Sequence, residues 1–225
     1  MAAALSVYRS SLGKKFVMAV TGIILFGFVF AHMIGNLKMF QGEEKLNHYA
    51  EFLREVGSPL LAQGQLLWIV RLVLLASVIL HIVAAYQLTR ISQRSRPVAY
   101  ARRRDVQASY ASRTMRWGGI IILLFVIYHL LHFTFGTAHP SFVRENVYQN
   151  VVIGFQVWYV SLFYILAMLA LGLHLRHGLW SMFQTLGLNN KRWNSLLRGF
   201  ATIFAVLVVV GNVSIPVAVL AGFLR

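Results

Sequence analysis

Histidine is the residue type in this sequence with the most evident capacity for chemistry, and most of its histidines stand inside apolar stretches. Six of the eight lie within such stretches: His32, His81, His129, His132, His174 and His177. A polar side chain in a bilayer is costly and usually faces the interior of a helix bundle, where it indicates a functional site. Because imidazole binds iron, zinc and copper, these positions predict a metal or haem site.

The other residue types limit which metal site is possible. The chain has no cysteine, which excludes disulfides, thiolate-bound iron–sulfur clusters and covalently attached haem. A di-iron site in a helix bundle needs carboxylates that face the interior, and the apolar stretches contain no Asp or Glu. Haem with histidine ligands therefore fits better than a zinc or di-iron site.

Five apolar stretches predict an all-α integral membrane bundle that forms one domain over residues 1–225. Of the 225 residues, 58% are hydrophobic, more than a soluble domain of this length can bury. The expected spans are at about 16–37, 66–89, 117–137, 157–183 and 197–223. Between the first two, apolar residues at helical spacing predict an amphipathic helix at about 43–56 on the outer face.

The distribution of charge predicts the orientation of the spans. The net charge is +15, and three segments hold 15 of the 21 basic residues: Arg9, Lys14 and Lys15; Arg90, Arg94, Arg96, Arg102, Arg103, Arg104, Arg113 and Arg116; and Arg176, Lys191, Arg192 and Arg198. Five of the six acids lie in the other connections: Glu43, Glu44, Glu51, Glu55 and Glu145. The positive-inside rule then places the N-terminus in the cytoplasm and the C-terminus outside.

The basic segment Arg90–Arg116 has two interpretations. It is either a solvated loop attracted to anionic lipid or a docking surface for a cytoplasmic partner, and the sequence favours neither. Nucleic-acid binding is not expected, because aromatic residues do not alternate with the basic ones in a folded module.

The depth of each histidine follows from the orientation. With a rise of about 1.5 Å per residue, His32 and His129 fall in the outer half of the membrane. His81 and His174 fall in the inner half, shortly before Arg90 and Arg176. Four helices thus each supply one histidine, and the histidines pair by depth.

This pattern predicts two haems stacked across the membrane, each bound by two histidines. With both axial positions filled, the iron has no open site and serves electron transfer. Glycines could let the flat macrocycle approach a backbone, at Gly22, Gly27, Gly35, Gly136 and Gly172.

Polar neighbours complete this prediction. Ser77, one turn before His81, is expected to orient its second ring nitrogen. The candidates for contact with haem propionates are Arg71 at the outer level and Lys14, Lys15, Arg90 and Arg176 at the inner level, although snorkelling to the interface also accounts for them.

Four segments carry a resemblance to a known family: "FAHMIGN" at His32, "ILHIVAAYQL" at His81, "VIYHLLHF" at His129 and "HLRHGLWS" at His174. With its five spans, the chain resembles the single-polypeptide, di-haem cytochrome b subunit of succinate:quinone oxidoreductases over nearly its whole length. The resemblance implies that His32 and His129 bind the outer haem iron and that His81 and His174 bind the inner one. His177 then becomes a propionate or interface contact, His132 a secondary ligand candidate, and His139 has no assigned role.

The resemblance also implies a function and partners. Succinate would be oxidised on a flavoprotein subunit, and electrons would pass through an iron–sulfur subunit and the two b-type haems to a quinone, typically menaquinone. The chain would be a non-catalytic subunit of this respiratory complex in the bacterial cytoplasmic membrane. The same subunit could serve fumarate reduction, and the sequence does not decide the direction.

The quinone site is expected near the outer surface, where an apolar pocket needs a few polar anchors. The candidates are Lys38, Asn36, His48 and Tyr49, with Glu43, Glu44 or Glu51 as proton acceptor, while a site on the inner face stays open.

Other functions remain as alternatives. The cytochrome b of a formate dehydrogenase or hydrogenase also carries two haems, but its histidines are arranged differently. A transporter fits poorly, because the spans have no carboxylates and no inverted repeat. A haem-free membrane anchor requires that the histidines serve packing alone.

Overall fold

The computed structural model describes residues 10–95 and 110–225, and every regular element in this part of the chain is helical. The elements in chain order are α2 (Ser11–Asn36), η1 (Leu37–Gln41), α3 (Glu43–Glu55), α4 (Gln65–Arg94), α5 (Tyr110–His129), η2 (Leu130–Thr134), α6 (Val147–Gln156), α7 (Trp158–Thr185) and α8 (Asn194–Leu220). η1 is a short 3-10 helix, and η2 is a π-helical turn that continues α5. The predicted all-α class is confirmed.

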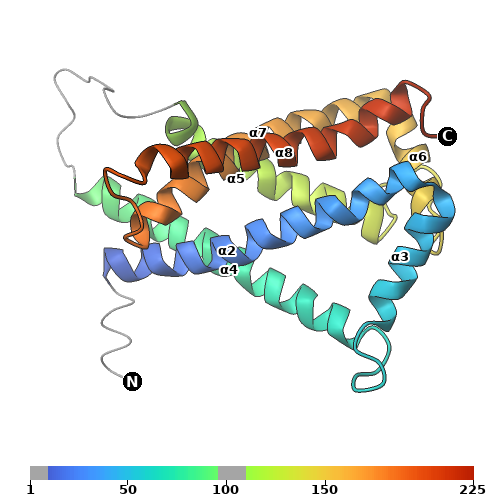
Figure 1. The fold of residues 1–225 in the computed structure, drawn as a ribbon, viewed down its shortest axis with the longest axis horizontal. Coiled ribbons are helices and arrows are strands. Elements are labelled where there is room, and N and C mark those ends of the chain that lie inside the picture. The colour runs from blue at the N-terminus through green and yellow to red at the C-terminus, as the bar shows by residue number, and fades with distance from the viewer. Residues whose placement is uncertain (1–9, 96–109) are drawn as a thin grey trace.

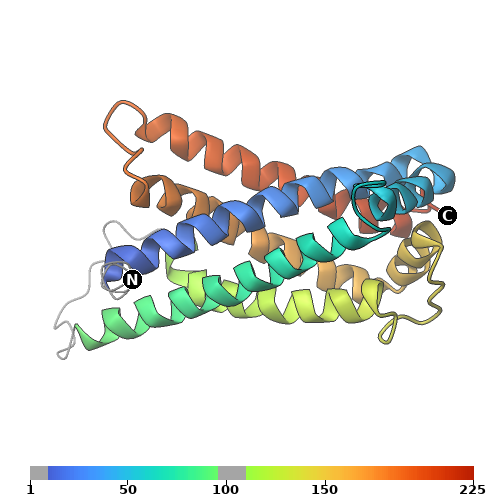
Figure 2. The ribbon, with the colours of Figure 1, turned by 90° about the horizontal axis from the view of Figure 1, so that it is seen from below.

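Five of the helices are long and apolar enough to cross a membrane, as the sequence predicted. They cover Ser11–Gln41, Gln65–Arg94, Thr114–Thr134, Trp158–Thr185 and Asn194–Leu220. They run lengthwise through the molecule, and the start of α2 lies at the opposite end from the last turn of α8 (Figure 1). Figure 2 shows the same bundle after a quarter turn, with α2, α4 and α5 on its near side.

The charges separate along this long axis. The start of α2, the end of α4 and the α7–α8 connection lie at one end of the bundle, and they carry most of the basic residues of the described ranges (Figure 1). α3 and α6, at the other end, hold or adjoin all five glutamates. Arg9 and residues 96–109, the centre of the predicted basic loop, lie outside the described residues. The charge separation underlies the predicted topology, and the side of the membrane each end faces stays a prediction.

A polar network holds the end where α3 and α6 lie. The side chain of Asn146 caps α6 by accepting a hydrogen bond from the Gln149 amide at 3.0 Å. It also accepts from Asn47 Nδ2 at 3.1 Å and donates to Glu43 at 2.6 Å. Asn47 in turn accepts from the Tyr148 amide at 3.1 Å. α3 occupies the range predicted for an amphipathic helix, whereas α6 and its contact with α3 were not predicted.

Small residues allow the spanning helices to approach closely. A side chain at Gly172 of α7 would collide with Val209 of α8, and one at Gly211 of α8 would collide with Met33 of α2. Helix pairs in membranes pack through such positions because lipid provides no hydrophobic force to drive them together. α7 and α8 form the most extensive pair, followed by α2 with α4 and α5 with α7.

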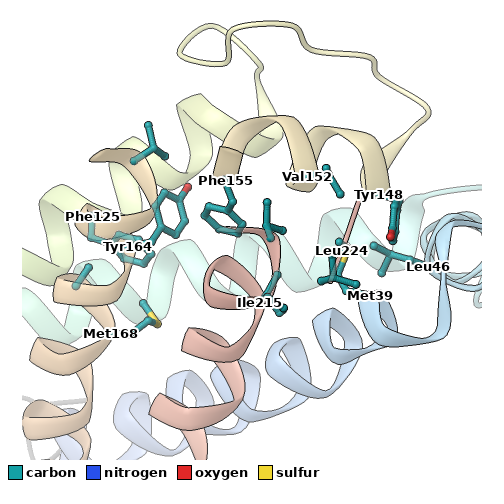
Figure 3. Close-up of a cluster of buried hydrophobic side chains, with 14 residues drawn as sticks. Met39, Leu46, Phe125, Tyr148, Val152, Phe155, Tyr164, Met168, Ile215 and Leu224 are labelled. Atoms are coloured by element: carbon teal, nitrogen blue, oxygen red, sulfur yellow. The ribbon is translucent and has the colours of Figure 1, made fainter. Parts of the chain in front are cut away.

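The buried core lies on the α7–α8 side. One cluster near the α3–α6 end joins residues from six elements, including Met39, Phe125, Phe155, Tyr164 and Ile215 (Figure 3). A second cluster, around Phe204 and Val208, packs α8 against α2 and α7. The spans that contain α2, α4 and α5 bury much smaller shares of their residues within the chain than α7 and α8 do. The four paired histidines lie on these three less buried helices and on α7: His32 on α2, His81 on α4, His129 on α5 and His174 on α7.

Candidate metal centres

The outer histidine pair joins α2 and α5. The rings of His32 and His129 have centroids 5.9 Å apart, with an interplanar angle of 84°. Phe28 stacks on His32 at 5.3 Å, and Phe125 lies 5.7 Å from His129. α2 and α5 have no extensive backbone packing in the described ranges, so the two histidines are a principal point of approach between these helices.

The inner pair joins α4 and α7 in the same way. The rings of His81 and His174 have centroids 6.3 Å apart at an interplanar angle of 53°. α4 packs along α2 and shows no extensive backbone packing with α7 within the residues described. The structure therefore brings together the two pairs that were predicted from depth, each between helices that have no extensive backbone packing with each other in the described ranges.

The ring separations fit an iron held between two imidazoles. With metal–nitrogen bonds of about 2 Å, two imidazoles on opposite sides of one metal have centroids roughly 6.3 Å apart. A zinc site needs three or four protein ligands. Within residues 10–95 and 110–225, no group of three or more His, Cys, Asp or Glu is placed to hold a metal. Haem supplies four nitrogens of its own, so two histidines suffice for each iron.

The hydrogen bond of His81 leaves its other ring nitrogen for a metal. Nδ1 of His81 lies 3.1 Å from Oγ1 of Thr21, which is buried on α2. The Thr21 hydroxyl donates to the Val17 carbonyl at 2.8 Å, so it accepts from His81 Nδ1–H. The tautomer with the proton on Nδ1 has its free lone pair on Nε2. Ser77 had been expected in this role; it is buried on α4, but Thr21 makes the bond.

Tyr164 plays the corresponding part for His129. Its hydroxyl, on α7, lies 3.4 Å from Nδ1 of His129 and 3.0 Å from Nδ1 of His132. His132 is fully buried, and the nearest ring centroids are those of Phe133 at 4.1 Å and His139 at 5.0 Å. His132, the secondary ligand candidate, is thus linked to His129 through the Tyr164 hydroxyl.

A cavity lies beside His174. A cavity of about 270 Å³ between α5 and α7 is lined by Thr114, Met115, Trp117, Gly118, Ile121, Ala170, Leu173 and His174. A Cβ on Gly118 would meet no atom within 4 Å, and one on Gly119 would lie 3.9 Å from Cε1 of His174. Nδ1 of His174 is buried without a hydrogen-bond partner among the described residues. Apolar walls, glycines and an imidazole are the surroundings that a haem requires, so the residues fit the group.

Only part of the predicted glycine set lies near the histidines. A Cβ on Gly22 would lie 3.7 Å from Cε1 of His81, and one on Gly27 would meet no atom within 4 Å. Gly35 instead makes room for Tyr49, Gly172 for Val209, and Gly136 adopts a φ of 76° beside Phe142. These three serve contacts within the protein, which corrects their assignment to the macrocycle.

The basic residues predicted to contact haem propionates lie in different parts of the structure. Lys14 of α2 and Arg90 of α4 line one cavity of about 400 Å³ together with Tyr86, Gln87, Ile91 and Arg94. His177 is half-buried on the His174 face of α7, and Lys15 is exposed. Arg176 donates to Thr202 Oγ1 of α8 at 3.3 Å, and Arg71 lies over the Trp68 ring at 5.0 Å. Of the propionate candidates, Lys14 and Arg90 therefore line one cavity, together with a third cation, Arg94.

Two of the residues predicted to anchor the quinone, Lys38 and Tyr49, contact each other. Nζ of Lys38 lies over the Tyr49 ring at 5.2 Å, and Tyr49 packs against Gly35, one turn after His32. His48 is exposed on α3. Of the acids proposed as proton acceptors, Glu43 is bonded to Asn146, while Glu44 and Glu51 are exposed.

Comparison with known proteins identifies the family. Residues 92–213, more than half of the 225 residues, match the family described as succinate dehydrogenase/fumarate reductase transmembrane subunit. The chain belongs to this family. No curated protein and no solved structure matches the chain.

The matched segment of this succinate dehydrogenase/fumarate reductase subunit runs from the last turn of α4 into α8. It contains His129 and His174, one member of each histidine pair, while His32 and His81 precede it. Family membership and the five spans together make the chain a multi-pass membrane subunit.

Proposed function

We propose that this chain is the membrane anchor and di-haem cytochrome b subunit of a succinate:quinone oxidoreductase, conveying electrons from a cytoplasmic iron–sulfur subunit to membrane menaquinone. One observation carries the proposal. Four helices each contribute one histidine, and the rings meet as two pairs with centroids 5.9 Å and 6.3 Å apart. Packing alone does not account for two such pairs across helices that otherwise stay apart.

Each residue has a defined part in this proposal. His32 and His129 hold the outer haem, and His81 and His174 hold the inner one. When bound, each haem supplies one-electron transfer without an open coordination site. Thr21 and Tyr164 fix the tautomers of His81 and His129 so that Nε2 faces the metal. Apolar side chains and lipid exclude water from both sites.

The charged groups at the two ends complete the proposal. Lys14 and Arg90, on one cavity at the basic end, are the best-placed partners for the propionates of the inner haem. Lys38 and Tyr49, near the outer end of α2, are the candidate anchors for the quinone. The iron–sulfur and flavoprotein subunits would dock at the basic, cytoplasmic end, and succinate would be oxidised on the flavoprotein.

Single substitutions of the four histidines test the haem assignment. Purified His32→Ala, His81→Ala, His129→Ala and His174→Ala variants should each retain about one haem per chain instead of two. His48→Ala, on the exposed face of α3, is the matched control and should retain both. Two haems per chain in all four variants would refute the assignment.

Substitution near the outer end of α2 tests the quinone site separately. In the assembled complex, Lys38→Ala and Tyr49→Leu should slow quinone reduction while succinate oxidation with a soluble acceptor stays unchanged. Unchanged quinone reduction in both variants would move the site away from α3.

A further inference from the structure

A hydrogen-bonded chain connects the outer ligand candidate to a buried side chain. The hydroxyl of Tyr164, on α7, lies between Nδ1 of His129 at 3.4 Å and Nδ1 of His132 at 3.0 Å. Tyr164 is 6% exposed and His132 is 0% exposed, so water does not compete for these groups. In the described part of the chain, the His132 ring has one hydrogen bond, from Nδ1 to Tyr164, while its Nε2 is buried without a partner.

Counting protons gives the chain a direction. If Nε2 of His129 binds iron, then Nδ1 carries the ring proton and donates to the Tyr164 oxygen. The hydroxyl has a single proton, which it then donates to the shorter contact, Nδ1 of His132. The order His129 to Tyr164 to His132 leaves no two donors facing each other. Hydrogen bonds in such a series polarise one another, so the Tyr164 oxygen becomes a stronger acceptor.

The local fold holds His132 in place for this role. The π-helical turn η2 begins directly after His129 and turns His132 toward α6 and α7. π-helical turns within α-helices often occur at functional sites. The His132 ring stacks on Tyr128 at 5.4 Å and on His139 at 5.0 Å. On the α6 side, a Cβ on Gly154 would lie 2.8 Å from its Cε1, so only glycine leaves room for the ring.

Within residues 10–95 and 110–225, the inner pair has no equivalent. His81 donates to Thr21, whose own proton goes to the Val17 backbone carbonyl at 2.8 Å. Nδ1 of His174 is buried without a partner among the described residues. In this part of the chain, a series of two polar side chains behind one imidazole therefore occurs at the outer pair and not at the inner one.

We propose that Tyr164 and His132 are positioning residues that set the reduction potential of the outer haem through the imidazole of His129. This inference rests on the proposed haem-binding function. A stronger acceptor on Nδ1–H leaves more electron density on Nε2, which stabilises the oxidised iron and lowers the potential. Removing the acceptor raises the potential of the outer haem and leaves the inner haem unchanged.

The test is a potentiometric titration of the purified holoprotein, following each haem by its spectrum. Tyr164→Phe and His132→Leu should each raise the reduction potential of the outer haem by about 59 mV. For a one-electron couple, this shift is a tenfold change in the reduction equilibrium constant. His132→Asn, which keeps an acceptor close to the position of Nδ1, should restore most of the wild-type value. Tyr128→Phe removes a hydroxyl from the same cluster that, in the described part of the chain, bonds neither histidine, and should change neither haem.

The variants separate the possible failures. An unchanged outer potential in Tyr164→Phe, or equal shifts in both haems, overturns the inference. If the Tyr164→Phe protein does not bind the outer haem, the test is the difference in outer-haem reduction potential between His132→Leu and His132→Asn. Neither of these substitutions alters a residue bonded to His129. A wild-type protein without haem refutes the proposed function itself, whereas two haems with unmoved potentials refute only the role of Tyr164 and His132.

Discussion

The Thr21–His81 hydrogen bond makes the inner site sensitive to a single oxygen atom. Thr21→Val replaces the hydroxyl with a methyl group of similar size at a position that is 4% exposed. The substitution removes the oxygen that lies 3.1 Å from Nδ1 of His81 and leaves the ring only its hydrogen bond with the Met18 backbone. Loss of the nearest acceptor of a buried donor costs up to about 3 kcal/mol. Because the unbound ring escapes this cost by moving its proton to Nε2, the penalty falls mainly on the haem-bound form.

We therefore expect inner-haem affinity to fall roughly 10- to 100-fold in Thr21→Val, the range typical of lost outer-shell hydrogen bonds to metal ligands. The assay is the rate of haem transfer from the purified protein to excess haem-free myoglobin, resolved into two phases. The outer haem serves as the internal control, and Thr21→Ser, which keeps the hydroxyl, should behave nearly as the wild type. If Thr21→Val and Thr21→Ser both release the inner haem at the wild-type rate, the Thr21 hydroxyl does not stabilise the haem-bound form of His81.

Three further predictions concern the fold. Gly154→Ala places a Cβ 2.8 Å from the buried His132 ring and should destabilise the protein by about 1–3 kcal/mol, seen as a lower thermal midpoint in detergent. Gly199→Ala, which would meet nothing within 4 Å, is its control and should leave the midpoint unchanged or slightly raised. Asn146→Ala removes the cap of α6 and should cost roughly 1–2 kcal/mol, while Asn146→Ser keeps the cap and should lose less; equal midpoints would refute the capping role. A reporter fused after the last residue should be active outside the membrane and one at the N-terminus inside, and the reverse would overturn the predicted orientation.

The spans and the pairing of the histidines could be predicted because both depend on position along the chain. Long apolar stretches locate the helices, and the basic residues fix relative depth, so His32 and His129 fall at one level and His81 and His174 at another. Rings at the same level on neighbouring helices then need only face inward to meet.

The partners of those histidines could not be predicted, because they depend on how each helix is rotated about its axis. Ser77, four residues from His81, was the natural choice from helical spacing, yet Thr21 lies 60 residues away and makes the bond. Tyr164 shows the same limitation, because its contact with His129 exists only once α5 packs on α7. Threonine and tyrosine are common in apolar stretches, and no local pattern separates these two from the rest.

Two other misses have local causes. α6 is a 10-residue apolar helix, too short to register as a span in a window of about 19 residues, so the predicted span begins after it at residue 157. Its cap, Asn146, was the available signal, since asparagine before an apolar run is a common helix start. Gly35, Gly136 and Gly172 were assigned to haem because glycine permits close approach, but the sequence does not say whether the neighbour is a cofactor or a side chain.

The proposed function requires that each of the two histidine pairs holds one haem. The most direct measurement is a reduced-minus-oxidised spectrum of the purified protein, with haem quantified per chain. We expect two low-spin b-type haems in each chain. A chain purified with its full helical content, supplied with haem and yet binding none, would contradict it.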